Sequence, residues 1–314
     1  MLPVDVPRQE ELLKTGNVPL SIVLPTYNES QNIARMLDSI ADTIPADSAA
    51  EIIVVDDNSP DDTGDIANRH ARNIRNKLRI QVISRPGKQG LSSAILAGVQ
   101  SAAGDIVVVM DGDFSHPPQT ILRLVEELED PECDIAVASR YVKGGAVMGW
   151  PFKRRIASKG ATKIAQVGLG IDVKDPMSGF FAFRRRIIEG VKFDAIGYKM
   201  LLEILVKTRG ARVREVPYTF ANRAAGTSKL DSSVVFDYFR AVWRLYRYGR
   251  SVANGERRAS VRFFSKAGRF YTVGATGLLV NYLASMLFNA LVPQLWYLYA
   301  TVIGIAFSMS SNFI

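Results

Sequence analysis

The sequence predicts an α/β domain with a Rossmann-like, mostly parallel sheet, followed by α-helical transmembrane segments. Two observations predict this fold class. Short runs of apolar, β-branched residues alternate with segments of helical periodicity, which is the pattern of a sheet covered by helices on both faces. Near residue 270 the hydropathy then rises sharply into two long uncharged stretches. The apolar fraction of 47% is sufficient for a packed core.

Five apolar runs are expected to form strands of the sheet. In chain order they are LSIVLP, EIIVVDD, RIQVIS, GDIVVVMDGD and DIAVASR. Helices are expected after Asn28, from Asp61, from Gln89, and from Pro117 to Glu129. Because strands and helices alternate along the chain, most strands should run parallel, as they do in doubly wound sheets.

Polar residues follow four of these strands. They are Tyr27, Asn28 and Glu29, then Asp56, Asp57 and Asn58, then Asp111 and Asp113, and finally Ser139 and Arg140. Ligands bind at the carboxyl ends of the strands in such sheets, so we expect these side chains to share one site. Carboxylates there are suited to hydrogen-bonding ribose hydroxyls and base N–H groups. Asn28, Asp57 and Ser59 are also suited to cap nearby helices, and capping is compatible with binding.

Asp111, Gly112 and Asp113 place two carboxylates on a tight turn directly after a buried strand. Hard oxygen ligands of this kind suit Mg²⁺ or Mn²⁺, which commonly bind through one or two carboxylates together with substrate phosphates. A D-x-D triplet considered alone is more often a solvated turn. Its place after a buried strand favours the metal site.

Two amphipathic segments fall outside the alternating pattern. Residues 231–248, DSSVVFDYFRAVWRLYRY, place aromatic and aliphatic side chains on one helical stripe and three arginines on another. A basic helix with aromatic anchors beside a transmembrane span is typical of the membrane interface. In residues 153–167, Arg154 and Ser158 are four apart and share one helical face. The alternative is that both helices simply pack on the domain.

The C-terminal part contains a basic run and two long apolar stretches. From Arg240 to Arg269 there are nine Lys or Arg residues and a single acid, Glu256. Residues 270–292 and 295–314 then contain no charge, and each is long enough for a helix to cross a hydrocarbon layer of roughly 30 Å. Two transmembrane helices are therefore expected, and a hydrophobic hairpin buried in a soluble protein is the alternative. The second stretch ends without a polar flank, so we expect the natural chain to continue.

These features predict four parts of the chain: an N-terminal tail at 1–17, a domain at 18–230, an amphipathic interface helix and linker at 231–262, and a truncated transmembrane domain at 263–314. The N-terminal tail lacks the apolar core of a signal peptide. The positive-inside rule then places residues 1–269 in the cytosol, which predicts an integral membrane protein with a cytosolic domain. The single cysteine is compatible with a reducing compartment.

The net charge of +8 favours an anionic partner. Because the basic residues gather beside the apolar stretches, membrane lipid is favoured over nucleic acid. A dehydrogenase is disfavoured, since no G-x-G-x-x-G follows the first strand and no P-loop string occurs. A non-catalytic membrane module that binds anionic lipid is an alternative. Such a surface, however, gains nothing from the four acidic residues expected on one edge, Glu29, Asp57, Asp111 and Asp113.

Eight strings occur in the order found in one enzyme family. They are LSIVLPTYNE, IIVVDDNSPDDT, GLSSAILAG, MDGDFSHPP, SRYVKGG, WPFKRRIASKGA, DPMSGFFAF and RAAGTSKL. In these strings the chain resembles glycosyltransferase family 2 enzymes of the dolichol-phosphate mannose synthase (polyprenyl-phosphate mannosyltransferase) type, over roughly residues 18 to 248. The apolar stretches, which end in SMSSNFI, resemble the first half of a small four-helix membrane domain found in some of these enzymes. A processive polysaccharide synthase is disfavoured because the Q-x-x-R-W signature is absent.

The resemblance implies a GT-A fold and an inverting, metal-dependent transfer of mannose from GDP-mannose to dolichyl or polyprenyl phosphate at the cytosolic membrane face. UDP-glucose is the alternative donor, because the strings do not distinguish the two nucleotide sugars. A lipid phosphate is already anionic at neutral pH, so the nucleophile needs no general base with a tuned pKa. The site must instead hold two phosphate groups in line, which calls for a metal and for cationic side chains.

The resemblance also assigns roles to residues at matching positions. The donor would be held by Pro25, Tyr27, Glu29, Val55, Asp57, Asp111, Gly112 and Asp113, with Mg²⁺ or Mn²⁺ bound to Asp111 and Asp113. The expected catalytic residues are Asp113, Arg140, Arg223 and Lys229, and the acceptor phosphate would contact Arg140, Arg154 and Ser158. Related enzymes often carry Gln where this chain has Ser115. Ser115 is therefore the weakest candidate for a metal ligand, and a bridging water is the expected link to the ion.

Overall fold

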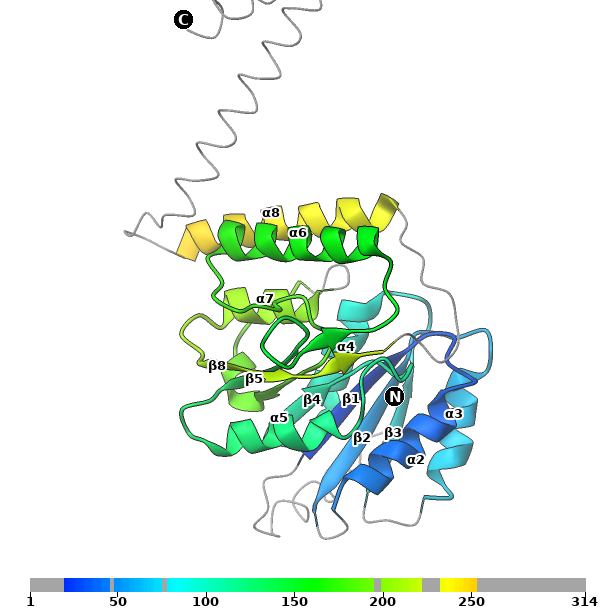
Figure 1. The fold of residues 1–314 in the computed structure, drawn as a ribbon. Coiled ribbons are helices and arrows are strands. Elements are labelled where there is room, and N and C mark those ends of the chain that lie inside the picture. Colours follow the sequence, from blue (N-terminus) through cyan, green and yellow to red (C-terminus); the bar gives the residue numbers. More distant parts are fainter. Residues whose placement is uncertain (1–19, 46–47, 75–77, 195–198, 222–231, 253–314) are drawn as a thin grey trace, which may run out of the picture. The chain divides into compact units, whose positions relative to one another are not determined.

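The computed structural model describes residues 20–45, 48–74, 78–194, 199–221 and 232–252, and all of them belong to one compact unit (Figure 1). A seven-stranded sheet forms its centre, with the strand order β3-β2-β1-β4-β7-β5-β8. These strands are β1 (Leu20–Thr26), β2 (Ala50–Asp56), β3 (Arg79–Ser84), β4 (Ile106–Val109), β5 (Ile135–Ser139), β7 (Phe181–Arg184) and β8 (Val213–Pro217).

The sheet is mostly parallel, as the sequence predicts. β1, β2, β3 and β4 pair in parallel, and so do β5 and β8. β7 lies between β4 and β5 and runs antiparallel to both. The five predicted runs correspond to β1 to β5, whereas β7 and β8 were not predicted. A separate two-stranded sheet pairs β6 (Ala146–Val147) with β9 (Thr219–Phe220).

Seven α-helices are described, together with the short 3₁₀-helix η2 (Arg185–Ile188). They are α2 (Ile33–Thr43), α3 (Thr63–Ala71), α4 (Leu91–Ser101), α5 (Thr120–Glu129), α6 (Phe152–Leu169), α7 (Met200–Lys207) and α8 (Ser232–Val252). The four helices predicted between the strands are confirmed, but each begins a few residues later than expected. Before α5, for example, the Thr120 amide donates to the Pro117 carbonyl, so residues 117–119 form a turn.

Helices cover both faces of the sheet, and alternation along each strand divides its side chains between two cores. Ile22 and Leu24 of β1 belong to the core under α2, α3 and α5. Val23 belongs to the core under α4 and α7. All three side chains are fully buried, as the apolar runs of the sequence predict for strands covered on both sides.

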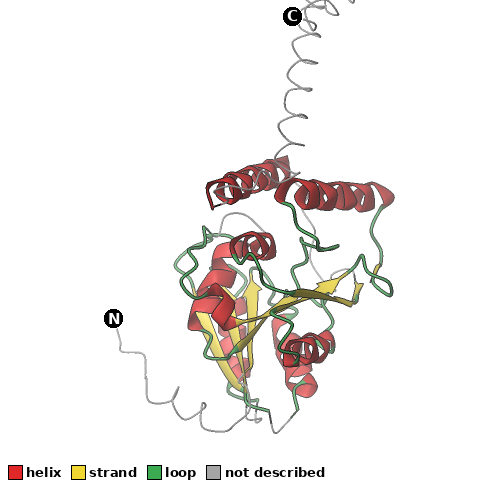
Figure 2. Ribbon diagram, turned by 90° about the vertical axis from the view of Figure 1, so that its left-hand side faces the viewer, coloured by secondary structure: helices red, strands yellow, loops and turns green. Residues whose placement is uncertain are grey.

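α6 and α8 pack side by side and form a further layer over α7 (Figures 1 and 2). Ala165 and Leu169 of α6 meet Val242 and Leu245 of α8 in a small apolar cluster. The Tyr238 hydroxyl donates to the Ala161 carbonyl at 2.6 Å and joins the two helices. The two amphipathic segments thus pack on the domain, and each also keeps apolar side chains in solvent: Phe152 and Ile156 on α6, and Phe239 and Trp243 on α8.

Within the described ranges, no helix has both the length and the apolar character needed to cross a membrane. The two predicted spans, at 270–292 and 295–314, lie outside these ranges and stay a prediction. The same holds for the proposed N-terminal tail and for the boundary at 262/263.

Candidate active site

The carboxyl ends of β1, β2 and β4 meet at one edge of the sheet, and the loops that leave them contain backbone turns that non-glycine residues rarely adopt. Asn28, Asn58, Asp62 and Phe114 all have φ between 60° and 62°. Such left-handed residues cost free energy and occur where tertiary contacts impose them, often at functional sites. These four residues lie within the loops that follow β1, β2 and β4, before α2, α3 and α5 begin.

The loop after β1 is tied to the loop after β2 by three backbone donors. The amides of Asn28, Glu29 and Ser30 donate to Ser59 Oγ, Thr63 Oγ1 and Asp61 Oδ2 at 3.0, 2.9 and 3.1 Å. Burial by itself would raise the pKa of Asp61, but the hydrogen bonds from Thr63 and Ser30 outweigh it and hold this pKa below its usual value.

Tyr27 and Glu29 lie at the open side of this pair of loops. The Tyr27 ring is partly exposed, and the Lys88 ammonium lies 3.8 Å from its centroid, so a flat, charged surface faces solvent there. Glu29 Oε2 accepts a hydrogen bond from Asn32 Nδ2 at 2.7 Å. Lys88 was missed by the sequence analysis because it lies in an irregular loop with no recognisable spacing.

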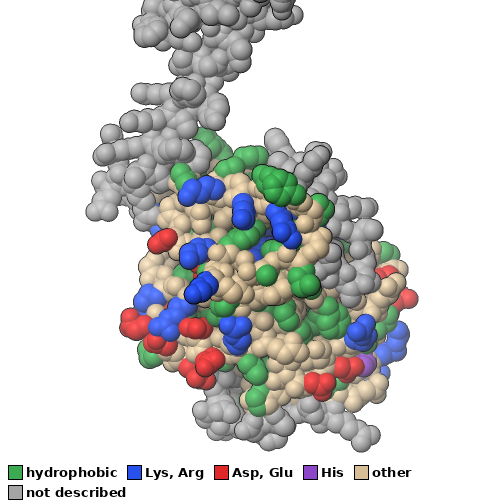
Figure 3. Space-filling model, viewed as in Figure 1, with side chains coloured by type: hydrophobic (Ala, Val, Ile, Leu, Met, Phe, Trp, Pro, Cys, Tyr) green, Lys and Arg blue, Asp and Glu red, His purple; other side chains and the backbone are tan. Residues whose placement is uncertain are grey.

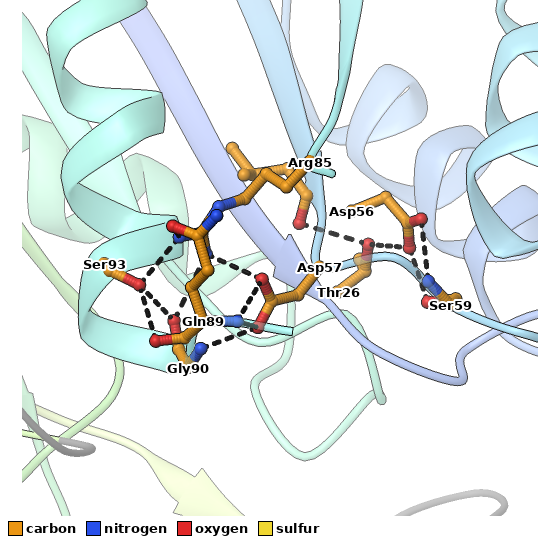
Figure 4. Close-up of polar contacts among 9 residues, drawn as sticks. Thr26, Asp56, Asp57, Ser59, Arg85, Gln89, Gly90 and Ser93 are labelled. Atoms are coloured by element: carbon orange, nitrogen blue, oxygen red, sulfur yellow. Dashed lines mark hydrogen bonds and ion pairs between the residues drawn. The ribbon is translucent and has the colours of Figure 1, made fainter. Parts of the chain in front are cut away.

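The Asp57 carboxylate is buried and accepts hydrogen bonds from several donors of the loop before α4 (Figure 4). Arg85 Nη1 donates to Oδ1 at 2.7 Å, and the amides of Gln89 and Gly90 donate at 3.0 and 2.8 Å. The Arg85 guanidinium also binds the Gln89 and Ser93 side chains. Asp57 therefore holds the 85–90 loop at the site edge, and its own oxygens face protein donors.

The capping roles considered for Asn28, Asp57 and Ser59 were wrong. The N-cap residues of α2 and α3 are Asn32 and Asp62, and neither makes a side-chain cap. Ser59 instead binds the Asp56 carboxylate through both its amide and its hydroxyl (Figure 4). Since the left-handed turns delay the helices, these side chains lie too far back in the chain to reach the first helical amides.

Pro25 and Val55 lie opposite each other in the β1–β2 register. Both are buried, and Val55 has no exposed side-chain surface. Their predicted donor-binding role stays a prediction.

Asp111 and Asp113 follow β4 as predicted, with Gly112 between them. Asp113 is almost fully buried, and its Oδ1 accepts hydrogen bonds from the Ser115 amide at 3.0 Å and the Ser115 hydroxyl at 2.6 Å. The left-handed Phe114 turn brings Ser115 back onto Asp113. Ser115 thus orients the carboxylate, and its own ligand role stays a prediction.

Asp111 is partly exposed and its backbone is held by a buried histidine. His116 Nδ1 accepts a hydrogen bond from the Asp111 amide at 3.0 Å, and the ring stacks on Phe180 with centroids 5.1 Å apart. At Gly179 an added Cβ would lie 3.2 Å from His116 Cε1 and 3.4 Å from Asp111 Oδ2. The missing side chain leaves the Asp111 carboxylate accessible.

This donor set fits a divalent cation that shares its coordination with a substrate. Two carboxylates on one turn supply hard oxygen ligands, as Mg²⁺ and Mn²⁺ prefer. Among the described residues, no cluster of three or more His, Cys, Asp or Glu could hold a metal by itself. The remaining coordination positions would therefore belong to phosphate oxygens and water.

Arg140 follows β5 and is locked in place by Asp175. Its Nε and Nη2 donate to the two Asp175 oxygens, both at 2.7 Å, and its amide donates to Oδ2 at 3.0 Å. Asp175 has no exposed side-chain surface, and its own amide donates to Glu215 Oε1 at 3.0 Å. Burial alone would lower the pKa of Arg140, but Asp175 more than reverses this and keeps the guanidinium charged. Neither Asp175 nor Glu215 is recognisable as a positioning residue from the sequence, because each lies far along the chain from Arg140.

Arg154 and Ser158 are brought to Arg140 by the N-terminal half of α6. The Arg154 guanidinium lies 4.1 Å from the centroid of the Trp150 ring, and that of Arg140 lies 5.5 Å from the same ring. Ser158 Oγ is 2.8 Å from the hydroxyl of Tyr141, the neighbour of Arg140. The fold therefore brings Arg140, Arg154 and Ser158 together around the Trp150 ring, and their predicted contact with the acceptor phosphate stays a prediction.

A lysine that sequence analysis missed lies in the same electrostatic environment. Burial lowers the pKa of Lys199 to about 8, and the positive charge of Arg140 adds to this, whereas Asp111 and Asp175 oppose it. Lys199 directly precedes α7, and the charges of Arg140, Asp111 and Asp175 all act on its ammonium group. Its only sequence signal was a single Lys before an apolar run.

Arg223 and Lys229 lie outside the described residues, so their predicted contacts with the phosphates stay a prediction. The neighbouring Ala221 is described, and its amide donates to the Ser115 carbonyl at 3.3 Å.

Comparisons with known proteins agree on one family. The model described as Glycosyl transferase family 2 matches residues 21–191. Dolichol-phosphate mannosyltransferase of Pyrococcus furiosus is 42% identical over 264 residues, which cover 83% of this chain and 70% of that protein. Polyprenol monophosphomannose synthase of Mycolicibacterium smegmatis is 35% identical over 68% of this chain and 81% of its own length. Undecaprenyl-phosphate mannosyltransferase of Micrococcus luteus is 33% identical over 72% and 92%.

Solved structures agree on the fold. Glucosyl-3-phosphoglycerate synthase from Mycobacterium tuberculosis, in complex with Mn²⁺, UDP-glucose and phosphoglyceric acid, superposes with a TM-score of 0.57 at 22% identity. The match covers 81% of this chain and 87% of that one. The expected GT-A architecture is thereby confirmed for the α/β domain.

Proposed function

Because this chain belongs to glycosyl transferase family 2, we propose that it transfers mannose from GDP-mannose to a dolichyl or polyprenyl phosphate, with inversion at the anomeric carbon. One observation supports this most directly. Asp111 and Asp113 follow β4 and Arg140 follows β5; both strands run antiparallel to β7, so these residues lie at the same edge of the sheet. Arg154 and Ser158 lie close to Arg140 and its neighbour Tyr141. An anionic donor and an anionic acceptor need these two kinds of site side by side.

The donor half of the site is assigned to the loops after β1, β2 and β4. The Tyr27 ring and the Lys88 ammonium offer a surface on which a purine can stack. Glu29 offers carboxylate oxygens to the nucleoside, while Asp57 fixes the Arg85 loop that borders it. Asp111 and Asp113 would hold the metal, which when bound neutralises charge on the departing nucleoside diphosphate.

The acceptor half is assigned to Arg140, Arg154 and Ser158. Arginine suits a phosphate because its guanidinium presents several donors in a fixed plane. The Arg140 guanidinium is held rigidly by Asp175, so its position is set before substrate arrives. The lipid phosphate attacks the anomeric carbon directly, and no side chain has to remove a proton from it.

The membrane half of the proposal rests on α6 and α8. Phe152 is 76% exposed and Trp243 is 62% exposed, on two helices that pack against each other. Large exposed apolar side chains next to basic ones are typical of helices in the membrane interface. This places the acceptor residues of α6 close to the lipid phosphates, and residues 263–314 are proposed as the anchor.

The test is transfer of radiolabel from GDP-mannose, with UDP-glucose in parallel, into a polyprenyl phosphate extract. Label should enter the lipid phase from GDP-mannose, disappear with a chelator, and return with Mg²⁺ or Mn²⁺. Label that enters the lipid phase from UDP-glucose alone would support the proposed transfer to a lipid phosphate but would show that the donor sugar is glucose and not mannose. No label from either donor, with folded protein, would favour a non-catalytic module that binds anionic lipid.

A further inference from the structure

A basic cavity of about 410 Å³ lies between α6 and the loops that follow β5 and precede β7. Four cationic side chains line it, Arg140, Lys159, Lys163 and Lys174, and no carboxylate does. Figure 3 shows Lys and Arg side chains gathered over the part of this face where α6 lies. None of the three lysines has a role in the donor or acceptor sites described above.

The positive charge of the cavity is not neutralised within the described part of the chain. Arg140 is paired with Asp175, so this pair contributes little net charge. Lys159, Lys163 and Lys174 make no ion pair with any described residue. Three uncompensated cations around one hollow raise the local potential and favour an anion there.

The walls of the cavity are held in place by hydrogen bonds that do not involve the lysine ammonium groups. Gln166 Nε2 donates to the Val173 carbonyl at 2.8 Å and ties α6 to the loop before β7. The Lys174 amide donates to Glu215 Oε2 at 2.8 Å, which anchors the same loop to β8. Thr162, also in the lining, has a buried hydroxyl with no hydrogen-bond partner among the described residues. The cavity is therefore preformed, with polar groups in its wall.

The lysines of α6 continue a stripe that begins with exposed apolar side chains. Phe152, Ile156, Lys159 and Lys163 follow spacings of four, three and four residues, which keep them on one helical face. Phe152 and Ile156 are 76% and 55% exposed. With this apolar end in a bilayer, the lysines further along lie at the depth of lipid phosphates, where cationic side chains are favoured.

We propose that this cavity binds the phosphate of an anionic bilayer lipid and thereby docks α6 on the membrane. The site shares Arg140 with the proposed acceptor group and extends beyond it to the three lysines; Tyr141 also lines the cavity, and its hydroxyl contacts Ser158. The inference rests on the proposed function for the presence of a membrane. Its consequence is that anionic lipid, and not only the acceptor, orients the acceptor site.

The experiment uses the full chain in zwitterionic detergent micelles, where no bilayer field attracts protein non-specifically. Short-chain phosphatidylglycerol is titrated and the heat of binding is measured, with short-chain phosphatidylcholine as the neutral match. The variant is Lys159→Gln/Lys163→Gln/Lys174→Gln. Its control is Arg69→Gln/Arg72→Gln/Arg79→Gln, which also removes three positive charges. Arg69 lies on α3, Arg72 directly follows α3, and Arg79 lies on β3. Glycerol 3-phosphate is titrated separately.

Saturable binding of phosphatidylglycerol is expected for the wild type and the control. The lysine variant should bind more than about tenfold more weakly, since even one lost charge-assisted hydrogen bond to a phosphate costs about tenfold in affinity. An equal loss of phosphatidylglycerol affinity in both variants would show that only the net charge of the protein matters, and it would overturn the proposal. Equally tight binding of glycerol 3-phosphate would also overturn it, in favour of a soluble phosphate. Mannosyl transfer is assayed independently. If that activity fails, the lipid-binding result can still be interpreted by itself.

Discussion

At the scale of single residues, the site depends on side chains that orient others. Ser115 holds the Asp113 carboxylate through two hydrogen bonds, and Asp175 holds the Arg140 guanidinium through two more. Both carboxylates are buried, which leaves them few alternative partners. Rigid placement of this kind lowers the reorganisation needed when charge develops in the transition state.

Asp113→Asn should lower kcat on the order of 100-fold or more, the size of effect seen when one electrostatic group of a transition state is removed. Ser115→Ala should cost about tenfold, because it loosens the carboxylate without removing it. Activity measured against Mn²⁺ concentration checks both, since each variant should require more metal. Unchanged metal dependence in Asp113→Asn would remove that residue from the metal site.

Asp175→Asn should raise KM for polyprenyl phosphate at least about tenfold while leaving GDP affinity unchanged. The buried Arg140 loses its charged partner, and breaking a buried ion pair typically costs about 3–5 kcal/mol of stability. Glu215→Gln, which weakens the hydrogen bonds to the Lys174 and Asp175 amides but leaves the Arg140–Asp175 ion pair intact, should have a smaller effect on the same KM. Kinetics at the two substrates, with unfolding measured in parallel, separate positioning from misfolding; equal losses for donor and acceptor would contradict the assignment.

At the scale of secondary-structure elements, close packing of helices on the sheet places the strand ends. α4 approaches β1 so closely that a Cβ added at Gly98 would lie 2.4 Å from Val23 Cγ1, a side chain with no exposed surface. On α6, a Cβ at Gly160 would meet nothing within 4 Å. Close packing against β1 therefore requires glycine at position 98. Packing imposes no such requirement at position 160.

Gly98→Ala should destabilise the protein, since overpacking costs about 1–3 kcal/mol while alanine regains only about 1 kcal/mol of helix propensity. Gly160→Ala is the matched control and should stabilise by roughly 0.5–1 kcal/mol for the propensity gain alone. Urea unfolding of the two variants measures both changes. Equal stabilisation by both substitutions would show that α4 can move away from β1 without loss of stability.

At the scale of the whole molecule, α6 and α8 form one layer of the α/β domain, and the proposed acceptor residues Arg154 and Ser158 lie on α6 itself. This layer combines exposed Phe152 and Trp243 with basic side chains, whereas the opposite helices α2, α3 and α5 cover the sheet. Under the proposed function, this layer is the surface through which the domain approaches the lipid phosphate.

Phe152→Ser/Trp243→Ser should weaken transfer to a long-chain polyprenyl phosphate in vesicles by at least about tenfold, since burial of one large apolar side chain contributes roughly 1.5–3 kcal/mol. Transfer to a short-chain, water-soluble prenyl phosphate should be unchanged. Leu122→Ser, at an exposed apolar position on α5, serves as the control and should leave both reactions intact. A parallel loss with the soluble acceptor would mean that the two residues shape the site itself and not its membrane contact.

The strands β1 to β5, the four helices between them and the carboxylates after β1, β2 and β4 were all predictable from the sequence, because apolar runs and D-x-D spacing are local signals. β7, β8 and the antiparallel position of β7 were not, since FAFR and VREVP lack the continuous apolar, β-branched runs of the predicted strands and their pairing is set by neighbouring strands. The capping predictions failed for a related reason: left-handed turns, which tertiary contacts impose, delayed the helix starts.

The sequence by itself determined the family, the α/β class and the chemistry expected at the strand ends, because these reside in contiguous strings. Only the tertiary structure decided which carboxylates are committed to protein partners. It turned Asp57 towards Arg85, paired Asp175 with Arg140 from 35 residues away, and set Lys199 in the field of both halves of the site. The physical reason is that a buried charge must pair with an opposite charge or a hydrogen-bond donor that the fold brings close to it. Because that partner can be distant in the sequence, local sequence patterns do not reveal it.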